Sequence, residues 1–123
     1  MKLFTAILLS VFSFIAPTKD ITDDIVNALK QGNTQVLVSN FAEKVSVKIL
    51  NQEDLLSKAQ SQSLIEDFFN RHKVKNFQTA HSSFMNGQQF ITGNLECNDG
   101  KYRVSILLRG NVISQFRIEN SND

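Results

Sequence analysis

The sequence is poor in the residues that build metal centres and covalent cross-links. It has one cysteine and two histidines among 123 residues. A single cysteine cannot form an intramolecular disulfide, so stability must come from the core. We expect Cys97 to behave as a small buried hydrophobe. The alternative is that it acts as a catalytic nucleophile or forms an intermolecular disulfide. The sequence contains no HExxH pattern and no cysteine cluster, so we expect no zinc site and no other cofactor.

An excess of charge is also missing. The formal net charge is +1, and it falls to about zero if Lys2 is removed with an N-terminal leader. Such a balance creates no general field that would attract nucleic acid. The chain has no tryptophan and ten phenylalanines, a composition that indicates a core and not a carbohydrate-stacking platform. GxSxG and P-loop patterns are absent, which leaves hydrolase and nucleotide-binding functions without support.

The N-terminus has the order of a secretory signal peptide. An apolar run follows Lys2, and it is too short to span a bilayer as a helix. Cleavage after Ala16 and cleavage after Thr18 are both plausible. We expect residues 1–18 to be the signal peptide and residues 19–123 a single exported domain, periplasmic or extracellular and soluble. The alternative is a buried N-terminal helix.

The stretch Ser57–His72 organises the predicted fold. Ser57 and Gln60 have the spacing of a capping box, which satisfies the first free N–H groups of a helix. Four apolar residues then fall on one stripe of that helix: Leu64, Ile65, Phe68 and Phe69. This stripe is the largest compact apolar surface available to cover a sheet.

The residues before this helix predict two further helices and a hairpin. A helix is expected from Ile21 to Gly32, where the glycine can take the left-handed conformation that ends a helix. A short second helix is expected from Asn33 or Thr34 to Phe41. Alternation over Val45–Ile49 predicts a strand, and Asp54–Ser57 can return beside it.

From Lys75 onward the apolar residues recur every second position. This period predicts a meander of about four antiparallel strands, separated by turn signals such as Asn98-Asp99-Gly100 and Gly110-Asn111. Tyr102 lies in phase with the apolar residues of its strand, and His81 lies in phase with Phe77. Helices gathered on one face of an antiparallel sheet make an α+β domain.

This order of elements resembles the cone-shaped fold of the nuclear transport factor 2-like (cystatin-like) superfamily, in which a long helix lies in the concavity of a curved sheet. Several short motifs occur in a set order along the chain: Ser57-Lys58-Ala59-Gln60, Asp67-Phe68-Phe69, Phe77 to His81, Gly93-Asn94-Leu95, Gly100-Lys101-Tyr102-Arg103-Val104 and Phe116-Arg117-Ile118-Glu119. These motifs are similar to those of an uncharacterised family of small secreted bacterial proteins, a domain of unknown function. One departure is that His81 is followed by Ser82, where the family pattern tends to have glycine. The resemblance implies a fold and export, and it supplies no catalytic residue.

His81 and Tyr102 are the candidate ligand-binding residues. If the strands pair in sequence order, both side chains lie on the concave face and line one pocket at the open end of the cone. The alternative places Tyr102 as a plug and His81 on the outside. Asp67 is read as a solvated carboxylate on the helix surface, and no aspartate is placed to partner His81.

These observations favour an exported binding or scaffolding domain that is not an enzyme. Its partner would be a small apolar or amphipathic ligand, or another protein, and not nucleic acid. A small pocket enzyme that uses His81 as acid and base is one alternative. A purely structural homodimer is the other.

Overall fold

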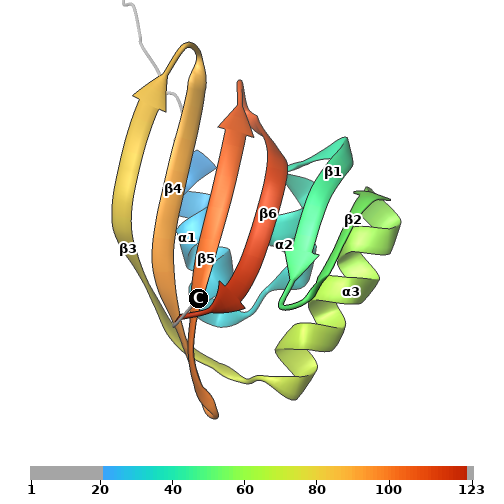
Figure 1. Cartoon of the computed structure of the whole chain (residues 1–123), viewed down its shortest axis with the longest axis vertical. Coiled ribbons are helices and arrows are strands. Elements are labelled where there is room, and N and C mark those ends of the chain that lie inside the picture. Colours follow the sequence, from blue (N-terminus) through green and yellow to red (C-terminus); the bar gives the residue numbers. More distant parts are fainter. Residues whose placement is uncertain (1–20, 122–123) are drawn as a thin grey trace, which may run out of the picture.

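The computed structural model describes residues 21–121, and the predicted signal peptide lies outside them. Three helices and six strands follow one another within this range (Figure 1). The helices are α1 (Ile21–Gln31), α2 (Thr34–Ser39) and α3 (Lys58–Arg71). The strands are β1 (Phe41–Ile49), β2 (Gln52–Ser57), β3 (Val74–Met85), β4 (Gln88–Cys97), β5 (Gly100–Arg109) and β6 (Val112–Asn120). No helix in this part of the chain is long and apolar enough to cross a membrane.

Helix α3 is defined by local sequence signals, as predicted. The Ser57 side chain accepts a hydrogen bond from the Gln60 amide at 3.2 Å, and the Gln60 side chain accepts one from the Ser57 amide at 3.0 Å. This reciprocal capping box satisfies two N–H groups that have no partner within the helix. The end of helix α1 also follows a local signal. It ends before Gly32, whose φ of 63° is the left-handed conformation expected there.

The strands form one curved sheet in the order β2-β1-β6-β5-β4-β3. The meander β3 to β6 has the predicted antiparallel pairing, and the β1–β2 hairpin extends it. Strand β1 runs parallel to β6, which is the only parallel pairing in the described sheet. Figure 1 shows β3 at one edge, β2 at the other beside α3, and α1 and α2 behind the sheet.

One apolar core fills the concave side of the sheet. It joins α1, α2 and α3 to the inward positions of five strands, and Phe41, Phe77 and Phe116 are each at most 1% exposed within it. Ile65, Phe68 and Phe69 of the predicted α3 stripe are buried, whereas Leu64 is half-buried. The α+β architecture expected from the sequence is confirmed. Helix α3 lies over β1 and β2, and α1 covers β3, so no single helix covers the whole sheet.

One predicted boundary is wrong. Helix α2 ends at Ser39 with Asn40 as its cap, so Phe41 begins β1 and does not end α2. On β6 the pairing shifts near Ser114, so Ile113 is buried and Val112 is exposed, the reverse of a regular alternation.

Candidate functional site

The two predicted pocket residues, His81 and Tyr102, lie on opposite faces of the sheet. Tyr102 pairs with Leu95 on the concave face and is buried. His81 pairs with Thr92 on the outer face and is exposed. The reason is a bulge at Ala80, which adds one residue to β3 and reverses the direction of every side chain beyond it. The prediction that they line one pocket is therefore wrong in its geometry.

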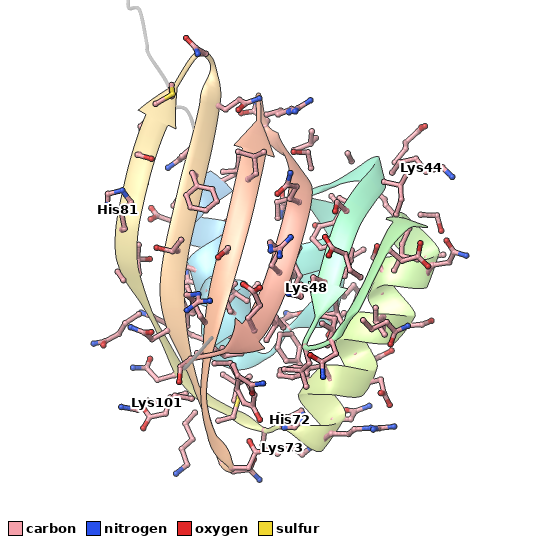
Figure 2. All side chains as sticks on the ribbon, in the orientation of Figure 1. Lys44, Lys48, His72, Lys73, His81 and Lys101 are labelled. Atoms are coloured by element: carbon pink, nitrogen blue, oxygen red, sulfur yellow. The ribbon has the colours of Figure 1, made fainter. Side chains whose placement is uncertain are left out.

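Tyr102 meets the other histidine instead. His72 follows the last residue of α3, and its Nδ1 lies 2.6 Å from Oδ2 of Asp99 in the β4–β5 turn. The Tyr102 hydroxyl donates to the same carboxylate oxygen at 3.1 Å and lies 3.1 Å from His72 Nδ1. Figure 2 shows His72 at the lower end of the molecule, far from His81 on β3. We call these three side chains the His72 cluster.

The carboxylate fixes which ring nitrogen of His72 carries hydrogen. An ionised carboxylate can only accept hydrogen bonds, so Nδ1 donates to Asp99 and Nε2 is the acceptor of the neutral ring. The hydrogen bond from His72 holds the pKa of Asp99 below its usual value, and Tyr102 adds to this effect. Burial is the main cause that raises the pKa of Tyr102 from 10.0 to about 12, and the hydrogen bond to Asp99 and the Asp99 charge contribute to this rise.

The Phe68 ring packs against two members of the His72 cluster. The Phe68 ring lies 4.3 Å from the His72 ring and tilts by 30°, while it meets Tyr102 edge-on at 5.3 Å. The buried Cys97 thiol lies nearby in sequence, and burial together with the Asp99 charge raises its pKa to about 11. A thiol with so high a pKa is a poor nucleophile at neutral pH, in accord with the expectation of a small buried hydrophobe.

A groove runs between the sheet edge and the central helix and ends at His72. Its wider part has a volume of about 450 Å³. A second cavity of about 160 Å³ shares Gln52, Leu64 and Asp67 with it and extends to Phe68, Arg71 and His72. We call the two together the β2–α3 groove. The residues that line its wider part are Gln52, Leu56, Gln60, Ser63, Leu64 and Asp67.

The groove is apolar in the middle and charged at one end. Leu56 and Leu64 are half-buried and provide the apolar surface. Arg71 pairs with Asp67 at 3.2 Å across one helical turn, and both side chains are largely exposed. An exposed pair of this kind contributes little to stability, so both groups are available to a ligand.

Sequence reasoning missed the His72 cluster for an identifiable reason. Asp99 lies in the β4–β5 turn and Tyr102 follows three residues later on β5, a spacing that was a usable signal. His72, however, is 27 residues from Asp99, and only the pairing of β3 with β4 brings the end of α3 to that turn. Within residues 21–121, no group of three or more metal-binding side chains lies close enough to hold an ion.

The comparisons with known proteins agree with this architecture. Residues 22–120 match the family described as a domain of unknown function, DUF4783. The chain belongs to that family. No curated protein matches it.

Solved structures of this family share the fold. A DUF4783 protein from Bacteroides uniformis is 27% identical, with a TM-score of 0.78, and the match covers 85% of this chain and 100% of that one. A second, from Bacteroides fragilis, is 28% identical, with a TM-score of 0.76, over 83% of this chain and 100% of that one. An NTF2-like protein of unknown function from Cytophaga hutchinsonii is 12% identical, with a TM-score of 0.61, over 87% and 92% of the two chains. The predicted nuclear transport factor 2-like fold is confirmed.

Proposed function

We propose that this domain is a non-enzymatic binding module that holds an amphipathic ligand in the β2–α3 groove. The observation that carries the proposal is the combination of an apolar floor with a fixed polar end. Leu56 and Leu64 would receive an apolar chain, and His72 and Arg71 would meet its polar head. The concave interior is filled by buried side chains, Phe41, Phe77 and Phe116 among them, so we assign the ligand to the groove and not to the interior.

The chemistry of the groove's end favours a ligand with an acidic head. Arg71 carries a positive charge, and a protonated His72 would donate from Nε2 while Asp99 holds Nδ1. Asp67 already neutralises part of the Arg71 charge, which limits the attraction. We therefore expect modest affinity, with most of it from the apolar chain.

A titration with dodecanoate, followed by amide NMR shifts, tests the proposal. Saturable shifts concentrated on β2 and on the groove side of α3 would support it. Dodecyltrimethylammonium, which has the same chain and the opposite charge, should bind more weakly. Shifts spread over the whole sheet, or equal affinity for both amphiphiles, would contradict the assignment.

A second candidate function follows from the same cluster. A carboxylate-oriented imidazole beside a cavity is the arrangement that acid–base catalysis requires, and His72 would take the role that the sequence analysis considered for His81. Against it, the cavity beside the ring is about 160 Å³, which is small for a substrate pocket.

Hydrolysis of 4-nitrophenyl acetate separates the two functions. The chain has two histidines, so each serves as a control for the other. An acid–base enzyme should lose turnover in His72→Gln and keep it in His81→Gln. Equal background rates in both variants and in the wild type would favour the binding module.

We further infer that the domain is exported. The support is the charged residue Lys2 followed by an apolar run too short to span a bilayer. The N-terminus of protein secreted by the native host should then lie between Pro17 and Asp20. An intact Met1 in the secreted fraction would contradict export by a cleaved signal.

A further inference from the structure

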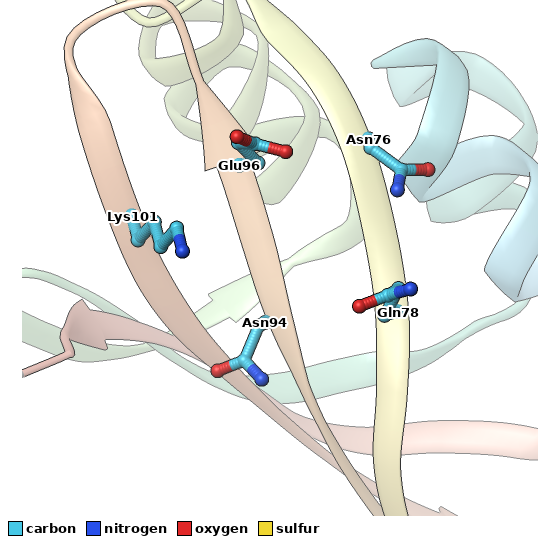
Figure 3. Close-up of a pocket in the computed structure, with 5 residues that line it drawn as sticks. All are labelled: Asn76, Gln78, Asn94, Glu96 and Lys101. Carbon is cyan, nitrogen blue, oxygen red and sulfur yellow. The ribbon is translucent and has the colours of Figure 1, made fainter.

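A second hollow lies on the outer face of the sheet, away from the β2–α3 groove. It has a volume of about 220 Å³ and spans three neighbouring strands (Figure 3). Five polar side chains line it: Asn76 and Gln78 from β3, Asn94 and Glu96 from β4, and Lys101 from β5. In Figure 3 the end of Lys101 is directed toward the middle strand, β4.

The hollow is built by irregularities in β3. Lys75 and Ala80 are extra residues in the pairing with β4, so a bulge lies on each side of the segment that carries Asn76 and Gln78. Bulges bend a strand and increase its twist. Gly93 permits the close approach that results, because a Cβ there would lie 2.5 Å from the Gln78 carbonyl oxygen. The bulged backbone of β3 and its close approach to β4 therefore position the side chains that line the hollow.

The two charged side chains in the hollow, Glu96 and Lys101, make no ion pair within residues 21–121. The two residues are nevertheless directly paired across β4 and β5. The carboxamides of Asn76, Gln78 and Asn94 likewise make no side-chain hydrogen bond within that range. By contrast, the neighbouring outward charges Lys48, Arg117 and Glu119 are joined in one network.

We propose that this hollow binds a small zwitterion, an amino acid or a dipeptide. Glu96 would accept hydrogen bonds from the ligand's ammonium group, and Lys101 would donate to its carboxylate. The three carboxamides each offer a donor and an acceptor, which matches a peptide group. A neutral sugar would leave the two charges unpaired, and a cavity of this size excludes a large ligand.

Glycylglycine, titrated into the protein and followed by amide NMR shifts, tests the proposal. We expect saturable shifts at the five lining residues. Affinity should fall roughly tenfold or more in Glu96→Gln and in Lys101→Gln, because each change removes a charge-assisted hydrogen bond and keeps the shape. Glu43→Gln and Lys44→Gln, exposed charges on β1, are the matched controls and should bind as the wild type does.

The outcomes separate this site from the groove. Acetate and methylammonium, which each carry half of the zwitterion, should bind far more weakly than glycylglycine. Glucose binding as tightly as glycylglycine would overturn the proposed ligand class. The absence of saturable shifts, or equal losses in the control variants, would overturn the site itself. None of these results depends on whether dodecanoate enters the β2–α3 groove.

Discussion

His72 Nδ1 lies 2.6 Å from Asp99 Oδ2, and this contact ties the end of α3 to the turn between β4 and β5. Tyr102 completes the link by donating to the same oxygen. Because α3 forms one wall of the β2–α3 groove, the contact also positions the polar end of that groove. The His72 cluster thus joins α3 to the sheet, and we propose that it also forms part of a binding site.

Tyr102 should titrate at unusually high pH. It is the only tyrosine, and the chain has no tryptophan, so tyrosinate absorbance reports on this side chain alone. The expected midpoint is about 12, against an ordinary value of 10.0. Because the folded pKa is raised, folding stability should be fully present below pH 10 and should fall as the pH rises through 12.

Asp99→Asn provides the control for this titration. Removing the carboxylate charge should lower the Tyr102 midpoint toward its ordinary value, although burial should keep it above 10.0. A wild-type midpoint near 10.0 in protein that is still folded by circular dichroism would show that the hydroxyl faces water and that the cluster is open.

A second charge network should make the protein sensitive to acid. Glu119 accepts from Lys48 at 2.9 Å and from Arg117 at 3.3 Å, and the Lys48 hydrogen bond is the main cause that holds its pKa below 4.5. Its stabilisation is therefore present above pH 4.5 and is lost as the pH falls through the lower, folded pKa.

The measurement for this network is urea unfolding of Glu119→Gln at several pH values. At neutral pH the variant should be less stable than the wild type by about 1–2 kcal/mol. The difference should shrink as the pH falls below 4.5. Glu43→Gln, at an exposed position, should show neither effect. A difference that is constant with pH would mean that packing, and not charge, explains the loss.

The sequence predicted those features whose causes are local. The capping box needs only Ser57 and Gln60, three residues apart, and the end of α1 needs only a glycine at position 32. Strand phases were predicted correctly wherever the pairing was regular, as along the strand that carries Tyr102.

The candidate site could not be predicted because its causes are distant in sequence. The face on which His81 lies depends on a bulge, and the bulge exists only in the pairing of β3 with β4. The partner of Tyr102 depends on where α3 ends in space. Period-two reasoning assumes an unbroken ladder, so one extra residue was enough to misplace the histidine.

Gly93 is expected to tolerate no side chain. A Cβ at this position would lie 2.3 Å from Cζ of the buried Phe77 ring and 2.5 Å from a backbone oxygen of β3. Gly93→Ala should therefore destabilise the fold by about 1–3 kcal/mol or more. Thr92→Ala, at the neighbouring outward position, is the control for thermal unfolding. An unchanged melting temperature for Gly93→Ala would show that β3 and β4 are farther apart than described.

The most direct test of the proposed function uses two adjacent leucines of β2. Leu56 lines the groove, whereas Leu55 points to the opposite face and is 63% exposed. Leu56→Gln and Leu55→Gln make the same chemical change on opposite sides of one strand. Calorimetric titration with dodecanoate should show a roughly tenfold weaker affinity for Leu56→Gln, in line with the loss of one buried apolar side chain. Leu55→Gln should bind like the wild type. Equal affinities for the two variants would contradict a ligand site in the β2–α3 groove.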